Sequence, residues 1–234
     1  MIYLRSILFY LGQALSVIPF FVISIFALAF KPTTRSKIIA GWARFVTVWL
    51  RWICGLSHVT EGMEHIPDEP CIFACAHSST WETIATQTFL PPLAWVLKKE
   101  LLNIPLFGLG LRATGPIAID RSDSKNALDQ VIDQGIEKFK ENRYVLIFPE
   151  GTRAPWGKPS HYKKGAAKLA IAANKQIVPV AHNAGAFWSR DSFWIKPGQI
   201  RCVFGEPISV EGKTDTELTR QIRQWILAQE FDEK

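Results

Sequence analysis

Two apolar stretches fill the first part of the chain, up to residue 58. Residues 6–30 contain no charged side chain, with Arg5 before them and Lys31 after them. As a helix they would be about 37 Å long, which exceeds a hydrocarbon layer of roughly 30 Å. Large apolar residues end the stretch, where a signal peptide has small ones, so we predict a retained membrane anchor. The alternative is a buried core helix, against which the length without any polar face argues. Because Pro19 lies in its middle, the anchor either crosses the membrane or kinks there into a hairpin within one leaflet.

The second stretch combines apolar residues with a stripe of positive charge. Lys37, Arg44 and Arg51 are spaced by seven residues, so a helix would place all three on one face. Isoleucine, phenylalanine and tryptophan lie between them, which predicts an amphipathic helix at a membrane surface. The alternative is an ordinary helix with a solvated charged face. Since cations cluster after the first stretch, we expect the remaining chain on the cytoplasmic face of the cytoplasmic (inner) membrane.

From about Val59 onward, short apolar runs alternate with amphipathic stretches. The runs predict buried strands at residues 71–76, 94–98, 117–120, 144–148, 177–181 and 200–204. The amphipathic stretches predict helices from a Ser124 cap to Phe139, at 164–174 and at 216–229. This alternation predicts an α/β fold with a mixed, largely parallel sheet flanked by helices. We therefore divide the chain into two membrane-anchoring helices at 1–58 and an α/β domain at 59–234.

A histidine and a carboxylate follow the first predicted strand. His77 comes directly after residues 71–76, and Glu82 lies five positions later. Across a turn, the carboxylate of Glu82 can bond one imidazole nitrogen of His77 and leave the other nitrogen free as a general base. The alternative is a histidine with only a structural role. Reactive residues gather at the carboxyl ends of strands in such sheets, which favours the catalytic interpretation.

A second polar segment, Phe-Pro-Glu-Gly-Thr-Arg, occupies residues 148–153 at the end of another predicted strand. Gly151 permits close approach to the main chain, and the Thr152 hydroxyl with the Arg153 guanidinium suits a phosphate or several hydroxyls. The alternative is a plain turn with an exposed ion pair. The strand at 117–120 ends before Arg121, which is a candidate for a second positive contact or for a surface pair.

The last of these segments, at residues 177–185, is less informative. Pro179 interrupts an apolar run and predicts an edge strand or a bulge. His182 follows that run, and a lone histidine there is more often structural than catalytic.

Composition narrows the classes of partner. The 234 residues include 27 Lys and Arg against 21 Asp and Glu, and the net charge of +6 suits acidic lipids or phosphorylated substrates. The sequence has no nucleic-acid-binding motif, so we expect no nucleic-acid partner. The four cysteines form no Cys-x-x-Cys pair, so we predict no metal site. Gly108–Ala113 fits a dinucleotide-binding pattern, but no strand precedes it.

Taken together and in order, these segments resemble the 1-acyl-glycerol-3-phosphate acyltransferase family, within the glycerolipid acyltransferases. Residues 148–153 match the family's substrate motif in full. His77 with Glu82 resembles the first motif, although the family has Asp where this chain has Glu82. The resemblance covers about residues 59–210, and further blocks lie at 98–101, 104–108, 117–121, 164–166 and 178–180.

The resemblance implies transfer of a fatty acyl chain from acyl-CoA or acyl carrier protein to the 2-hydroxyl of lysophosphatidic acid, which gives phosphatidic acid. His77 would be the general base and Glu82 would orient it, without a covalent intermediate on Ser78. The expected partners are membrane lipid, this acceptor and the acyl donor, and no cofactor is expected. The implied substrate-binding residues are Glu150, Gly151, Thr152, Arg153, Arg121 and Lys99.

Three alternatives stay open on the sequence alone. The first is a related membrane acyltransferase with a different lyso-lipid or polyol-phosphate acceptor. The second is a catalytically silent lipid-binding member, against which His77 and Arg153 both argue. The third is a hydrolase that uses the same histidine, although the sequence shows no evident nucleophile for it.

Overall fold

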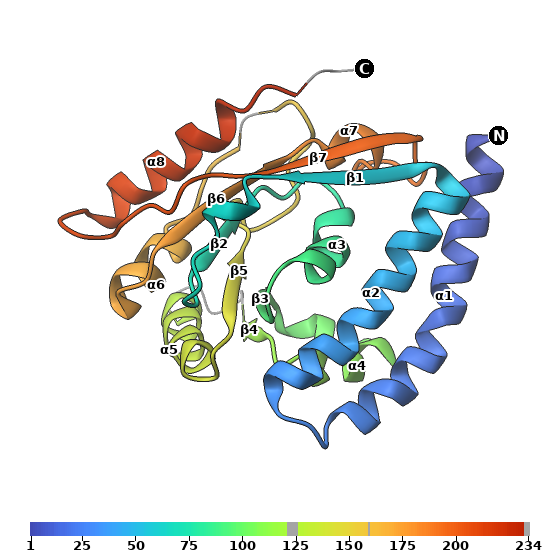
Figure 1. Ribbon diagram of the computed structural model, residues 1–234, viewed down its shortest axis with the longest axis horizontal. Helices are drawn as coiled ribbons and strands as arrows, with labels where there is room; N and C mark the ends of the chain where they lie inside the picture. The colour runs from blue at the N-terminus through green and yellow to red at the C-terminus, as the bar shows by residue number, and fades with distance from the viewer. Residues whose placement is uncertain (121–125, 159, 232–234) are drawn as a thin grey trace.

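The computed structural model describes residues 1–120, 126–158 and 160–231. An N-terminal pair of helices precedes a seven-stranded sheet, and further helices cover both faces of that sheet (Figure 1). The predicted α/β class, with a mixed and largely parallel sheet flanked by helices, is confirmed.

The two N-terminal helices form an antiparallel hairpin along one side of the molecule (Figure 1). Helix α1 spans Ile2–Ala27 and α2 spans Pro32–Cys54, with Pro32 in the first turn of α2. Gly55 ends α2 with a left-handed φ of 68°. The helix α1 continues through Pro19, so the chain reverses at residues 28–31 and not at the proline, because packing against α2 supports α1 on both sides of it.

The sheet has the strand order β1-β7-β6-β2-β5-β3-β4. Every neighbouring pair is parallel except β6 with β7. The strands are β1 (Leu56–Glu61), β2 (Ile72–Cys75), β3 (Leu93–Lys98), β4 (Ile117–Ile119), β5 (Tyr144–Ile147), β6 (Ile177–His182) and β7 (Gly198–Phe204). All six predicted strands are therefore present.

The first strand, β1, was not predicted. Its polar residues hide the apolar alternation, and it forms a strand because it pairs in parallel with β7 along its whole length. The predicted division at residue 58 falls inside β1, and the division itself stays a prediction.

The expectation of an edge strand at Pro179 is wrong, since β6 is an inner strand that pairs with both β2 and β7. The alternative expectation of a bulge fits, since two residues separate Ile177 from Val180 whereas three separate their partners Ile208 and Phe204. The ladder with β7 begins at Val180, one residue after the proline. The Pro179 carbonyl still accepts a bond from the Gly205 N–H at 2.9 Å. An inner strand thus tolerates this proline because the N–H that it lacks falls at the end of a ladder.

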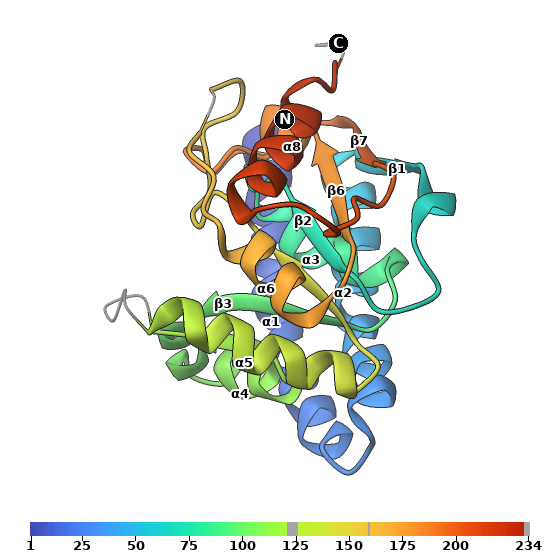
Figure 2. The same cartoon turned by 90° about the vertical axis from the view of Figure 1, so that its left-hand side faces the viewer.

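Two groups of helices cover the two faces of the sheet (Figures 1 and 2). Helices α2 and α3 (Trp81–Phe89) share a core with one face, into which Phe73 and Cys75 of β2 point. Ile72 and Ala74 point into the opposite core, which is covered by α5 (Ala127–Lys140), α6 (Gly165–Ala173) and α8 (Asp215–Leu227). The remaining described helices are α4 (Phe107–Ala113), α7 (Ala184–Phe187) and the 3₁₀ turns η1 (Met63–His65) and η2 (Lys99–Asn103).

The three helices expected from the amphipathic stretches correspond to α5, α6 and α8. Ser124, the expected cap of the first, lies outside the described residues, and Asn126 precedes α5. Thr214 caps α8 by accepting the Glu217 N–H, while Glu217 accepts the Thr214 N–H in return.

The helical hairpin packs tightly, both within itself and against the α/β domain. Phe9 of α1 and Leu50 of α2 lie in the same core as the sheet. Gly12 lies so close to Trp49 that a Cβ atom there would be 2.7 Å from its Cε2. Glycine at this position therefore sets the distance between α1 and α2.

We expect Gly12→Ala to destabilise the protein by about 1–3 kcal/mol, because the added methyl group forces the two helices apart. Gly41→Ala is the matched control, since a Cβ atom at Gly41 of α2 meets nothing within 4 Å. Alanine favours a helix interior, so the control should be neutral or stabilising by roughly 0.5–1 kcal/mol. Thermal unfolding in detergent micelles measures both, and equal melting temperatures for the two variants would contradict the packing argument.

Candidate active site

Three strand ends bring the polar segments together. Strands β2, β5 and β6 run parallel, so their carboxyl ends meet at one edge of the sheet. His77 follows β2, the segment 148–153 follows β5, and His182 ends β6. The three polar segments therefore gather at this edge of the sheet, where such folds carry their reactive residues.

The carboxylate of Glu82 holds the imidazole of His77. Its Oε1 lies 2.7 Å from His77 Nδ1 and also accepts the N–H groups of Ser78 at 2.9 Å and Ser79 at 2.8 Å. Glu82 is in the first turn of α3 and is fully buried. An ionised carboxylate only accepts hydrogen bonds, so Nδ1 carries the hydrogen and Nε2 is left with a free lone pair.

The glutamate at position 82 reaches the imidazole despite its extra methylene. Because Glu82 sits at the helix N-terminus, where main-chain N–H groups converge, its charge is stabilised as well as its position. The ring of His77 also stacks on Phe148, with centroids 3.9 Å apart and planes 16° apart. The imidazole is thus fixed both at its edge and on its face.

His77 and Arg153 open onto the same cavity, whose volume is about 570 Å³. Gly151 and Thr152 line it as well. One wall is apolar and includes Val96, Leu97, Leu101, Ile119, Leu128, Val131 and Ile147. The rim is cationic and includes Lys98, Arg153, Lys163, Lys164 and Lys168. The cavity therefore suits a molecule with an apolar chain and an anionic group, held beside a basic nitrogen.

The segment 151–153 is held in place by its neighbours. Gly151 has a left-handed φ of 69°, and a Cβ atom there would lie 3.0 Å from Lys163 Cε. Arg153 is exposed and donates from Nη1 to Thr80 Oγ1 at 2.9 Å, while Arg190 donates to the Arg153 carbonyl. These contacts fix the position of Arg153, which lines the same cavity as His77.

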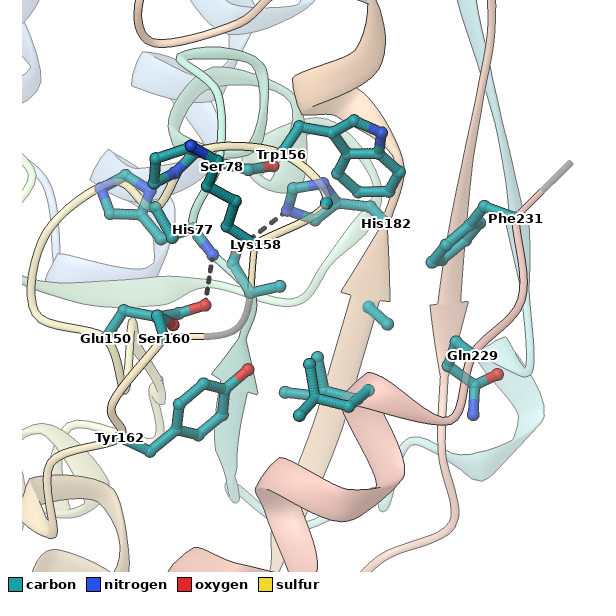
Figure 3. Close-up of a pocket in the computed structure, with 17 residues that line it drawn as sticks. His77, Ser78, Glu150, Trp156, Lys158, Ser160, Tyr162, His182, Gln229 and Phe231 are labelled. Carbon is teal, nitrogen blue, oxygen red and sulfur yellow. Dashed lines mark hydrogen bonds between the residues drawn. The ribbon is translucent and has the colours of Figure 1, made fainter. Parts of the chain in front are cut away.

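Glu150 faces a different direction from Arg153. Its Oε1 accepts the main-chain N–H of His77 at 3.2 Å, and it lines a second cavity of about 340 Å³ together with Tyr162 and His182 (Figure 3). Burial raises the pKa of the Glu150 carboxyl to about 7. Glu150 is not one of the described residues that line the larger cavity of about 570 Å³.

His182 is buried and fully engaged. Its Nε2 lies 2.8 Å from the Ala76 carbonyl oxygen, and its Nδ1 accepts the Ala184 N–H at 3.3 Å. The ring packs edge-on against Trp81. These contacts agree with the structural role that the sequence favours for it.

Two predicted binding residues are not brought to the site by the described structure. Lys99 lies in η2 and is not among the described residues that line the larger cavity, whereas Lys98 is. Arg121 lies outside the described residues, so its contact stays a prediction. Within the part of the chain that the structure describes, no three His, Cys, Asp or Glu side chains gather as metal ligands would.

The sequence did not reveal several residues that complete the site. Thr80 anchors Arg153, Phe148 supports the His77 ring, and Lys163 and Lys168 add to the cationic rim. Phe148 was part of a recognised motif, but a stacking role has no signature in the sequence. Lys163 lies just before α6 and Lys168 lies within it. In the sequence, both look like ordinary surface residues.

The raised pKa of Glu150 makes stability depend on pH. Its pKa is 4.5 as an ordinary carboxyl and about 7 in the folded protein, so between these values the folded state holds the extra proton. The contribution of Glu150 to the free energy of unfolding is therefore full below pH 4.5 and is lost as the pH rises through about 7. We expect the melting temperature of Glu150→Gln to depend less on pH across this window than that of the wild type. The exposed control Glu211→Gln should show the same pH dependence as the wild type. Parallel curves for wild type and Glu150→Gln would contradict the raised pKa.

Several known proteins are similar to this chain. A family model described as Acyltransferase matches residues 57–183. A protein from Pseudomonas aeruginosa named 1-acyl-sn-glycerol-3-phosphate acyltransferase is 39% identical over 230 residues, which cover 95% of this chain and 89% of the relative. The human protein named 1-acyl-sn-glycerol-3-phosphate acyltransferase beta is 29% identical and is matched over 80% of this chain and 67% of its own length.

A solved structure shares the fold. The crystal structure of the 1-acyl-sn-glycerophosphate (LPA) acyltransferase from Thermotoga maritima matches 99% of this chain and 98% of its own chain, with a TM-score of 0.76. The sequence identity is 21%. The likeness therefore includes the N-terminal helices as well as the sheet.

Proposed function

The chain belongs to the acyltransferase family, and we propose that this enzyme transfers a fatty acyl group from a thioester to the 2-hydroxyl of 1-acyl-glycerol 3-phosphate. The observation that carries the proposal is the shared cavity, which His77 and Arg153 line together with an apolar wall. The names of the relatives support the same acceptor. The product is phosphatidic acid.

The imidazole of His77 performs the proton transfer. Its Nε2 takes the proton of the acceptor hydroxyl as the oxygen attacks the thioester carbonyl carbon. A carbon–oxygen bond forms, the carbon–sulfur bond breaks, and the proton passes from Nε2 to the departing thiolate. Glu82 keeps Nδ1 protonated and stabilises the imidazolium between these steps. Direct attack on the thioester leaves no role for an acyl-Ser78 intermediate.

The cationic rim and the apolar wall divide the substrates between them. Arg153, with Thr152 and the lysines of the rim, holds the phosphate of the acceptor through charge-assisted hydrogen bonds. The apolar wall covers a fatty chain close to the imidazole. A thioester carried by either coenzyme A or acyl carrier protein fits this chemistry, because both present the same sulfur.

The helical hairpin places this cavity at a membrane. Among the described helices, α1 is the one that is long and apolar enough to cross a membrane. It contacts the α/β domain near its start, where Tyr3 packs on Trp194, and again at Phe20, which faces Gly110 of α4. Because both regions of α1 lie against the same domain, we place the hairpin in the cytoplasmic leaflet, where the acceptor's chain stays in hydrocarbon.

Product analysis tests the proposed function. Purified protein in lipid micelles is incubated with a labelled acyl thioester and a panel of acceptors, including 1-acyl-glycerol 3-phosphate, a lyso-aminolipid and dihydroxyacetone phosphate. We expect labelled phosphatidic acid as the main product. Preference for another acceptor would replace the proposed substrate, and release of free fatty acid alone would indicate a hydrolase.

We expect His77→Ala to lower the turnover number by about 10²–10⁴, because the acceptor hydroxyl loses its base. His161→Ala is the matched control, since His161 is exposed and is not among the described residues that line either cavity beside His77. Initial rates with saturating donor and acceptor measure both variants. Near-normal turnover in His77→Ala would eliminate the base assignment.

We expect Arg153→Ala to raise the KM for the acceptor by about 10- to 100-fold, which corresponds to the loss of a hydrogen bond to a charged group. The KM for the acyl donor should change little. Arg220→Ala, which removes an exposed arginine on α8, is the matched control. An effect of Arg153→Ala on the donor alone would count against a phosphate-binding role.

A further inference from the structure

The peptide unit between Ala76 and His77 is bonded at both of its polar groups by buried side chains. Its carbonyl oxygen, on Ala76, lies 2.8 Å from His182 Nε2. Its N–H group, on His77, donates to Glu150 Oε1 at 3.2 Å. Figure 3 shows these two side chains approaching from different sides, His182 from the end of β6 and Glu150 from the loop after β5.

The tautomer of His182 fits this contact. The Ala184 N–H donates to Nδ1, so the hydrogen of a neutral imidazole lies on Nε2 and points at the Ala76 oxygen. His182 is 1% exposed and packs against Trp81, the residue before Glu82. Its orientation is therefore fixed by its surroundings and does not depend on substrate.

This peptide unit determines where the imidazole of His77 points. The C=O and N–H of a trans peptide lie on opposite edges of one plane, so bonds at both edges prevent the plane from rotating. The Cα of His77 is attached directly to that plane, and a rotation there would swing the ring away from Glu82. The last hydrogen bond of the sheet here runs from the Ala76 N–H to the Val180 oxygen at 2.9 Å, and it belongs to the preceding peptide unit.

We propose that Glu150 and His182 are positioning residues that clamp the Ala76–His77 peptide from its two edges and so keep the imidazole aimed at the acceptor. The assignment of His77 as the base rests on the proposed function, whereas the clamp itself does not. For Glu150 this role differs from direct contact with substrate, because its carboxylate faces the main chain of His77.

Kinetics of two variant pairs test the clamp. Glu150→Met removes the carboxylate that accepts the His77 N–H. His182→Phe removes the N–H that donates to the Ala76 carbonyl, while it keeps a ring against Trp81. We expect both to lower kcat by about 10- to 100-fold, since a displacement of about 1 Å is enough for such a loss, and to leave both KM values nearly unchanged. The conservative variants Glu150→Gln and His182→Gln retain the needed atoms and should recover most of kcat. Gln229→Ala is the control and should match the wild type, because Gln229 lies across the cavity of about 340 Å³ that Glu150 and His182 also line (Figure 3).

Each contrary result overturns the clamp. A raised acceptor KM with unchanged kcat in Glu150→Met would return Glu150 to substrate binding. Conservative variants as inactive as Glu150→Met and His182→Phe would show that the hydrogen bonds are not what matters. A kcat close to wild type in Glu150→Met and His182→Phe would remove the role altogether.

Hydrogen exchange tests the clamp without turnover. At single-residue resolution, we expect Glu150→Met to speed exchange of the His77 amide by about tenfold or more, the protection that about 1.4 kcal/mol of hydrogen bonding gives. The Ala76 amide, bonded within the sheet, should not change. Equal acceleration at both amides would indicate local unfolding and overturn the clamp. A wild type that forms no diacyl lipid would defeat the proposed function but leave this measurement valid.

Discussion

One carboxylate oxygen organises the chemistry of this protein. Oε1 of Glu82 accepts from the imidazole of His77 and from the main-chain N–H groups of Ser78 and Ser79. Three donors meet this oxygen at the N-terminus of α3, which makes the buried charge tolerable, and the second oxygen, Oε2, lies 3.8 Å from His182 Nε2. The turn after β2, the start of α3 and the ring are therefore fixed by the same atom, and a neutral side chain at position 82 would weaken all three together.

The loop after β5 completes this arrangement from the other side. The His77 N–H donates to Glu150, and the His77 carbonyl accepts the Ala154 N–H at 2.7 Å. Phe148, from the same loop, stacks on the ring. The two polar segments of the sequence are thus one structural unit, in which the loop that carries Arg153 also supports the imidazole. The spacing between His77 and Arg153 follows from these short contacts and from the pairing of β2 with β5.

The parts that could be predicted from the sequence are those encoded by local pattern. Apolar runs identified six strands, and polar residues at their ends located His77 and Arg153. The strand β1 escaped because it forms through pairing with β7, far along the chain. Pro179 misled because strand position depends on neighbours that a local pattern does not contain. The direction of the Glu150 side chain was equally hidden, because neighbouring residues of one loop can face different ways. Gly151 lines the cavity, whereas Glu150 bonds the main chain of His77.

The hairpin and the site belong to one hydrophobic core, and this has a consequence for membrane chemistry. Val46 and Leu50 of α2 pack in the same cluster as Trp81 and Ala85 of α3, the helix that carries Glu82. Closely packed interiors of this kind are hardly compressible, so a shift of one helix displaces the helix packed against it. A domain tethered by a free linker would let the imidazole vary in its distance from the lipid, whereas this core fixes that distance. Under the proposed function, the depth at which α1 and α2 settle in the membrane therefore also sets the depth at which the acceptor hydroxyl meets His77.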